Sequence, residues 1–371
     1  MKRRYDYDVL RVLSMLGVIY LHTAAGALRE LDNPVLWNFS NAVVAFATPA
    51  VPLFFMMSGA LLLEEDKTAD LSFLFRRRLP KILLPLCVWS ALVLLYTALR
   101  GDPAGALNSA LRFLNTPVVV PYWFVYALAP MYLISPLLRQ MTARLSRPHW
   151  NYMMGLWMVL TLGLYTVRSF VPAAWVLTVT EHWTLNVNFV GGYLGYFLLG
   201  AWLERWERIP PRRVLAGIIG AMAALSILGT RWDTYAHGAY SDRFTNYLTL
   251  FTMVLSAAIF LLAKSCLRGR ETRGKLLPLL AGVSFPVYLL HPLALGLVGR
   301  IWSLSTGLPE PVTVLHQITL YGLVVLFCIA AAVVLSSIPG VCFAFTGQSY
   351  AAACKSANLT ALLRRKNRPN P

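Results

Sequence analysis

The first apolar segment of the chain reads DVLRVLSMLGVIYLH over residues 8–22. Two ionisable residues, Arg11 and His22, interrupt a stretch that otherwise suits a lipid bilayer. Ionisable groups inside a membrane-spanning helix cost free energy unless they are partnered or used, so both residues are candidates for function. Eleven positions separate them by about 16 Å along a helix and return them to nearly the same face. One residue can therefore meet a ligand at the membrane surface while the other lies near the bilayer centre.

The composition indicates a membrane protein, because 57% of the residues are hydrophobic and only 13% are charged. About 20 apolar residues cross a hydrocarbon core of about 30 Å, and this chain has about ten such runs. We expect an all-α polytopic fold with one integral membrane domain over residues 1–345 and a basic cytoplasmic tail over residues 346–371. The expected spans are 9–27, 43–63, 79–98, 121–138, 151–168, 187–204, 214–230, 245–265, 276–298 and 317–340.

The net charge of +17 is distributed asymmetrically. With a cytoplasmic N-terminus, only seven of the 33 Lys and Arg fall on the outer side: Arg29, Arg100, Arg112, Arg168, Arg231, Arg243 and Arg300. This positive-inside bias predicts that both termini are cytoplasmic. Anionic lipids, rather than nucleic acid, account for the basic excess. We expect a multi-pass protein of the cell membrane, the inner membrane if the protein is bacterial.

The N-terminus also has features of a cleavable secretory signal, with basic residues 2–4, an apolar run and the small residues 25–27. Cleavage would remove His22. Asp6 and Asp8 in the approach, and the need for a first anchor, favour a retained helix. The five cysteines show no paired metal spacing, so we expect no metal site and no permanently bound cofactor.

A basic loop, FRRRLPKILLP at residues 75–85, separates the second and third expected spans. Arginine forks match phosphate oxygens, and lysine adds a point charge. Arg77, Arg78 and Lys81 are therefore candidates for binding a phosphate-bearing cytosolic donor. The same cations could simply end the helix at the lipid headgroups, and the sequence leaves both interpretations open.

Deeper polar residues occur in the ninth expected span, where Ser284, Tyr288 and His291 share one helical face. A polar stripe in an apolar helix should face the bundle interior. These residues are either part of a site or interhelical hydrogen-bonding groups, which are common in membrane bundles.

Two further candidates lie near proline-rich stretches. Pro49 and Pro52 precede Ser58 in the second span and predict a broken or kinked helix, because proline removes a backbone donor. Trp123 stands at the start of the fourth span, where it is a site candidate or a member of an interfacial aromatic belt.

These residues together resemble the membrane acyltransferase-3 family of integral membrane O-acyltransferases. The most diagnostic element is Arg11 followed after ten residues by His22. The other matching elements follow in the family's order: 54–59, 77–78 with 81–82 and 85, 123–124 with 132–133 and 136–138, 196–200, and 288–292.

The resemblance implies a ten-helix enzyme that transfers an acyl group, usually acetyl from coenzyme A, to a hydroxyl of a carbohydrate or related envelope molecule. It implies that His22 is the essential histidine and Arg11 its partner, with acyl-CoA as co-substrate and a carbohydrate or lipid-linked glycan as acceptor. The family often has arginine where this chain has Lys81. Lysine keeps the charge but loses the bidentate fork.

Acyl transfer to an alcohol needs a base, and histidine has an ordinary pKa near 6.5, close to the working pH. His22 is the candidate base, and Asp8 can pair with Arg11 at a spacing of three. An oxyanion donor could be Tyr288, Ser58 or His291. A covalent acyl-histidine is the alternative mechanism and predicts ping-pong kinetics.

The acceptor could bind outside the membrane at residues 181–183 or 231–235, although interfacial anchoring explains these aromatic residues equally well. The main alternative function is a multi-pass transporter or lipid-linked glycan flippase that uses intramembrane Arg and His. Transporters more often show paired halves with corresponding helix breaks, and none is evident here.

Overall fold

A computed structural model describes residues 3–171, 191–272, 274–308 and 310–360, which form helices and turns without a strand. Two segments, Leu74–Arg78 (η2) and Trp157–Gly163 (η4), are π-helical turns. The helices are α1 Tyr5–Thr23, α2 Pro34–Ala47, α3 Ala50–Leu62, α4 Leu71–Phe73, α5 Leu79–Leu99, α6 Pro103–Leu111, α7 Trp123–Arg144, α8 Arg147–Leu156, α9 Leu164–Phe170, α11 Leu194–Glu204, α12 Arg212–His237, α13 Leu250–Leu267, α14 Leu276–Thr306, α15 Val314–Ser336, α16 Pro339–Thr346 and α17 Tyr350–Ser356.

Eight helical segments among the described residues are long and apolar enough to cross a membrane, which confirms the all-α polytopic fold. They correspond to eight of the ten expected spans. The other two expected spans contain α1, which carries Asp6, Asp8 and Arg11, and α11, which has only 11 residues. The count of ten and the cytoplasmic termini stay predictions.

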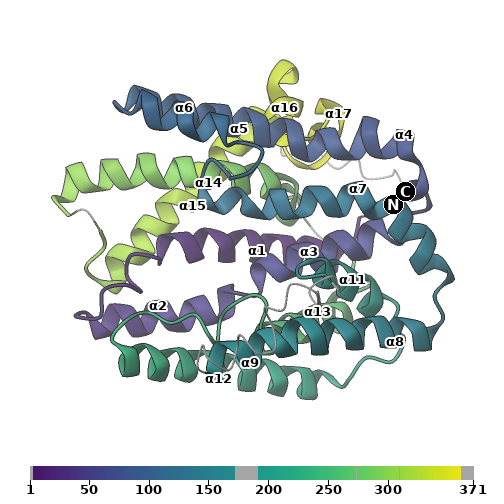
Figure 1. Cartoon of the computed structure of the whole chain (residues 1–371). Helices are drawn as coiled ribbons and strands as arrows, with labels where there is room; N and C mark the ends of the chain where they lie inside the picture. Colours follow the sequence, from purple (N-terminus) through teal and green to yellow (C-terminus); the bar gives the residue numbers. More distant parts are fainter. Residues whose placement is uncertain (1–2, 172–190, 273, 309, 361–371) are drawn as a thin grey trace, which may run out of the picture.

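Helix α1 lies in the middle of the bundle, although it is the most polar of the N-terminal helices (Figure 1). It packs against α2, α3, α13, α14 and α15. Its side chains Leu10, Met15 and Ile19 are fully buried, whereas Leu13 is exposed. The helix that carries Arg11 and His22 is therefore largely enclosed by other helices.

Helices α3 and α11 form the closest helix pair, and glycine explains this contact. A Cβ on Gly59 would lie 1.7 Å from the Phe197 carbonyl oxygen, and one on Gly200 would lie 1.9 Å from that of Met56. Small residues allow membrane helices to approach at backbone distance. Two motifs that carry the family resemblance, at 54–59 and 196–200, are thus the two sides of one interface.

The predicted break in the second span is confirmed, because α2 ends at Ala47 and α3 begins at Ala50. Asn33 caps α2 by accepting a hydrogen bond from the Leu36 backbone N–H, and Pro34 occupies the first turn. Proline at this position does not destabilise the helix, because a backbone N–H in the first turn has no intrahelical acceptor.

The segment after α15 folds back onto the bundle. Trp89 of α5 donates its indole N–H to the Phe345 carbonyl at 2.9 Å. Gly347 ends α16 with a left-handed φ of 69°. Any side chain at Gly347 would also collide with the Lys81 carbonyl, 2.0 Å from the Cβ position. The first part of the expected basic tail is therefore docked, while residues 361–371 lie outside the described part of the chain.

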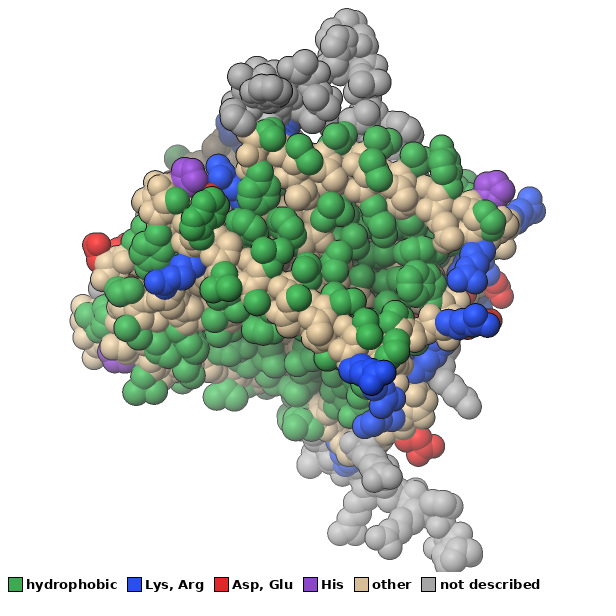
Figure 2. Space-filling model, turned by 90° about the horizontal axis from the view of Figure 1, so that it is seen from below, with side chains coloured by type: hydrophobic (Ala, Val, Ile, Leu, Met, Phe, Trp, Pro, Cys, Tyr) green, Lys and Arg blue, Asp and Glu red, His purple; other side chains and the backbone are tan. Residues whose placement is uncertain are grey.

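The surface agrees with a membrane setting. Figure 2 shows a face on which hydrophobic side chains cover the middle, with charged side chains mainly towards its ends. The α8–α9 segment and α12 are the least buried spans, with 22% of each 18-residue window buried inside the bundle. These two spans therefore expose most of their apolar side chains to lipid.

Candidate active site

A positively charged cavity lies at the N-terminal end of α1. Its volume is about 260 Å³, and its lining includes four arginines and one carboxylate: Arg3, Arg4, Arg11, Arg78 and Glu65. We call it the arginine cavity. Its charge favours an anionic ligand, because guanidinium groups bind phosphate and carboxylate oxygens through charge-assisted hydrogen bonds.

Asp8 organises this end of the helix. Its buried carboxylate accepts a hydrogen bond from Arg3 and lies 3.6 Å from Nη1 of Arg11. The expected pair between Asp8 and Arg11 is present, but Arg3 shares the same carboxylate. Asp8 therefore holds two guanidinium groups side by side, and about a third of the Arg11 side chain stays exposed.

A second cavity, of about 390 Å³, lies on the other side of Arg11. Arg3, Asp8 and Arg11 also line this cavity, together with Ser284 of α14 and Gln348 from the C-terminal segment. We call it the C-terminal cavity. Gln348 donates a side-chain hydrogen bond to the Gly282 carbonyl, which fixes the wall opposite Arg11.

The three basic residues expected to bind a donor lie in different places. Arg78 lines the arginine cavity and pairs with Glu65. Arg77 and Lys81 are exposed and line none of the cavities described for this chain. The π-helical turn η2 holds the arginines at the start of α5, a type of distortion that is frequent at functional sites.

Ser58 and Tyr132 extend the polar region into the bundle. The hydroxyl of Tyr132 lies close to Ser58 and within the field of Arg11 and Arg78. Ser58 comes from α3 and Tyr132 from α7, so four segments of the chain meet around this point.

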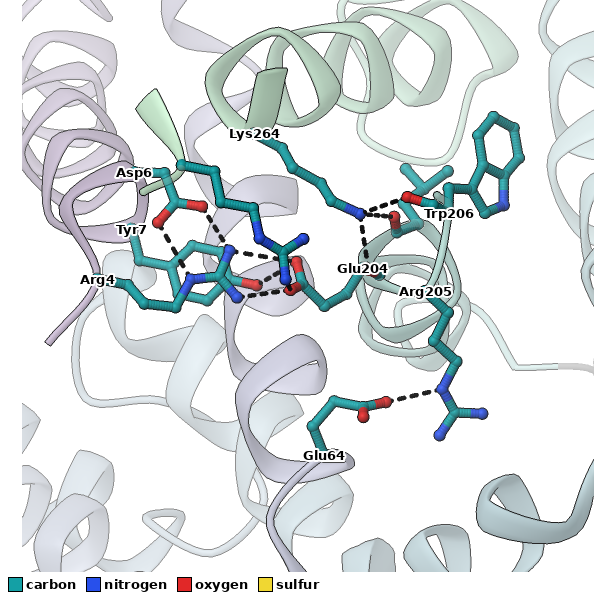
Figure 3. A network of polar contacts seen from close by, with 10 residues as sticks. Arg4, Asp6, Tyr7, Glu64, Glu204, Arg205, Trp206 and Lys264 are labelled. Carbon is teal, nitrogen blue, oxygen red and sulfur yellow. Dashed lines mark hydrogen bonds and ion pairs between the residues drawn. The ribbon is translucent and has the colours of Figure 1, made fainter. Parts of the chain in front are cut away.

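An ion-pair network fixes the start of α1 against α11 and α13 (Figure 3). Arg4 binds Glu204 at 2.6 Å, and Tyr7 donates its hydroxyl to the same carboxylate at 2.9 Å. Arg268 also pairs with Glu204, at 3.1 Å. Lys264 donates to three backbone carbonyls at the end of α11, those of Leu203, Glu204 and Trp206. Lys264 thus meets carbonyls of the kind that every helix leaves without an intrahelical partner at its C-terminus.

His22 lies beside His291 of α14, with ring centroids 5.2 Å apart. His291 is fully buried, and its Nδ1 lies in hydrogen-bond contact with the Tyr288 carbonyl. Because a carbonyl only accepts, Nδ1 carries the hydrogen, and Nε2 of a neutral ring has a free lone pair. Nε2 has no hydrogen-bond partner among the described residues, and none of those residues hydrogen-bonds the His22 ring.

The polar stripe of α14 faces the interior as expected, since Ser284, Tyr288 and His291 are all buried. Tyr288 donates its hydroxyl to the Pro121 carbonyl, so that proton is already used. The sequence suggested three oxyanion donors. The Tyr288 hydroxyl already donates to Pro121, Nδ1 of His291 is in contact with the Tyr288 carbonyl, and Ser58 lies near Tyr132. Trp123 packs against Tyr193 at 4.9 Å and Tyr247 at 5.7 Å, within an aromatic cluster inside the bundle.

The structure describes only one of the two candidate acceptor segments. Residues 181–183 lie outside the described part of the chain. In the segment 231–235, Asp233 is buried and binds Arg243 at 2.9 Å and His237 at 3.2 Å. This cluster ties the end of α12 to the following loop.

Sequence reasoning missed Arg3, Arg4 and Glu204. It treated the first two as the basic flank of a membrane helix. Arg4 precedes Arg11 by seven residues, two helical turns, and this spacing could have placed both on one face. Nothing in the local pattern points to Glu204, which reaches the site from a distant helix.

The fold and the site together define a polytopic membrane protein with a polar interior. The acyltransferase-3 family model, described as an acyltransferase domain, matches residues 4–337. The chain belongs to this family and is therefore a membrane acyltransferase. No curated protein and no solved structure matches the chain.

Proposed function

We propose that this protein is an O-acyltransferase that moves an acyl group, in the first instance acetyl, from coenzyme A to a hydroxyl of a carbohydrate or lipid-linked glycan of the cell envelope. The observation that carries the proposal is the arrangement along α1. Four arginines surround a cavity at one end of this helix, and His22 lies about 16 Å further along it beside a second histidine.

The arginine cavity is the proposed donor entrance. Coenzyme A carries several phosphate groups, and Arg11, Arg78, Arg3 and Arg4 offer guanidinium groups on one side of the bundle. Asp8 pairs with Arg3 and Arg11, Glu65 pairs with Arg78, and Asp6 and Glu204 pair with Arg4, and these contacts keep the arginines ordered. A flexible acyl-bearing arm could then pass along α1 towards His22.

His22 is the proposed general base. It accepts the proton of the acceptor hydroxyl as the oxygen attacks the thioester carbonyl. A C–O bond forms and the C–S bond breaks. The leaving thiolate then takes up the proton that His22 removed from the acceptor hydroxyl. His291 supports this step, because the lone pair on its Nε2 can accept a hydrogen bond from the His22 ring and orient it.

The test is transfer by the purified full chain in lipid with acyl-labelled acetyl-CoA and candidate sugar acceptors. Wild type should transfer or slowly hydrolyse the label, and His22→Ala should lose about 10²–10⁴-fold in rate. The matched control is His149→Ala, which removes an exposed histidine at the start of α8. Wild type that consumes no thioester contradicts the enzyme proposal, and a fully active His22→Ala contradicts the base assignment alone.

The same assay distinguishes direct transfer from a covalent route. Incubation without acceptor, followed at once by intact-protein mass measurement at neutral pH, would find one added acyl group that His22→Ala lacks only if an acyl-histidine forms. Direct transfer predicts no added acyl mass and a rate that depends on both substrates together.

A further inference from the structure

A third pocket, unconnected with the proposed reaction, lies where α8 begins and α11 ends. Its volume is about 590 Å³, and its lining includes three tryptophans and three arginines: Trp150, Trp202, Trp206, Arg147, Arg205 and Arg208. One carboxylate, Glu207, also lines it. We call it the tryptophan pocket. It has a net positive charge and apolar walls.

The walls of the tryptophan pocket are fixed by contacts. Trp202 packs edge-on against Trp206 at 4.9 Å and donates its indole N–H to Asn151 at 3.2 Å. The Arg205 guanidinium lies 4.9 Å from the centre of the Trp150 ring and binds Glu64 and the Thr142 carbonyl, both at 2.7 Å. Arg205 is therefore a structural part of the wall.

The other two arginines have no such role. Arg147 and Arg208 are exposed and form no ion pair or hydrogen bond with any described residue. The indole N–H of Trp150 is buried and has no acceptor among the described residues. The pocket thus combines two uncommitted guanidinium groups with aromatic surfaces, which suits a ligand with an anionic group and an apolar part.

The position of the pocket points to a lipid. It lies at the ends of α8 and α11 and just before α12, and the α8 and α12 spans are the least buried. Figure 2 shows Lys and Arg side chains gathered at one end of the apolar face on this side of the bundle. Tryptophan and arginine at the end of a lipid-facing helix lie at headgroup depth.

The tryptophan pocket shares no lining residue with the arginine cavity. Their arginines pair with different carboxylates, since Glu64 binds Arg205 and Glu65 binds Arg78. A ligand in the tryptophan pocket therefore does not need to be part of the acyl donor.

We infer that the tryptophan pocket binds the headgroup phosphate of an anionic phospholipid, with Arg147 and Arg208 on the phosphate oxygens and the tryptophans against the glycerol and upper acyl chains. The stoichiometry is one lipid per chain at this position. This inference concerns binding and does not depend on transfer activity.

The experiment is native mass spectrometry of the full chain with phosphatidylglycerol, with phosphatidylcholine as the neutral probe. The test variant is Arg147→Gln with Arg208→Gln. The control is Arg144→Gln with Arg213→Gln, which removes the same charge from exposed arginines nearby that do not line the pocket. A third variant, Arg147→Lys with Arg208→Lys, keeps the charge but loses the bidentate forks.

The test variant should bind phosphatidylglycerol at least about tenfold more weakly than wild type, and the control within about twofold. The lysine variant should lie between them. Equal loss in the test and control pairs would mean diffuse attraction to charge and would overturn the site. Displacement of the lipid by free coenzyme A would assign the pocket to the donor nucleotide and also overturn it. Displacement by inorganic phosphate at equal concentration would overturn the lipid specificity.

Discussion

The two ends of α1 use ionisable residues in opposite ways. At the N-terminal end, Arg3 and Arg11 share Asp8, and Arg4 pairs with Asp6 and with Glu204, which Arg268 also binds. At the other end, His22 and His291 face each other in apolar surroundings, and the free lone pair of His291 has no described partner. Loss of one arginine leaves its carboxylate with another cationic partner, whereas no neighbouring group among the described residues takes the place of either histidine. Single substitutions should therefore have small effects at the first end and large effects at the second.

After His22→Ala, the largest effect is expected for His291→Ala. The substitution removes the ring that we propose orients His22, so we expect kcat to fall by about 10²-fold or more with little change in KM for acyl-CoA. The measurement is steady-state transfer in lipid, with protein amount checked by size-exclusion profile. A variant that loses only donor affinity would place His291 in the donor site instead and would remove the contrast between the two ends.

The next effect separates two neighbouring arginines. Arg78→Ala should weaken coenzyme A binding by about tenfold, because it removes a charge-assisted contact in the arginine cavity. Arg77→Ala serves as the control, since that residue is exposed outside the cavity, and it should change binding by less than about twofold. Calorimetric titration with coenzyme A measures both. Equal losses would mean that the whole basic run attracts the donor without a defined cavity.

Glu204→Gln tests the network that holds the start of α1. The substitution leaves Arg4 and Arg268 with one weaker partner, so we expect the thermal unfolding midpoint to fall and KM for acyl-CoA to rise about threefold. Glu30→Gln, at an exposed position outside the network and the described cavities, is the matched control. A large fall in kcat at unchanged KM would show that this network acts on the histidine end as well.

The smallest effect is expected for Arg3→Ala. Asp8 would keep Arg11 as its partner, so coenzyme A binding should weaken by only about two- to threefold. Titration calorimetry at low and high salt provides the check, since the remaining difference should shrink as salt screens the exposed charges. A loss as large as that of Arg78→Ala would show that Arg3 contacts the donor directly.

The sequence predicted the features that depend on local pattern. Apolar runs located the spans, Pro49 located the break between α2 and α3, and spacing put Ser284, Tyr288 and His291 on one buried face. The pairing of Asp8 with Arg11 also followed from spacing within one helix.

The sequence could not predict contacts between distant helices. Nothing in either segment shows that His291 meets His22, or that Glu204 binds Arg4. Position along the chain also failed to separate Arg77 from Arg78, which both lie in η2 although only Arg78 lines the arginine cavity. Interhelical packing, rather than composition, determines these parts of the site.

The C-terminal cavity brings Arg3 together with Gln348, residues from opposite ends of the chain. During synthesis on the ribosome, α1 enters the membrane long before Gln348 exists, so Arg11 first meets water or lipid on that side. The wall opposite Arg11 closes only when residues after α15 have been made and Gly347 has seated against Lys81. A chain that stops before this point can insert all its long apolar helices and still lack a finished site. Assembly of the membrane bundle and maturation of its interior are thus separate events in time.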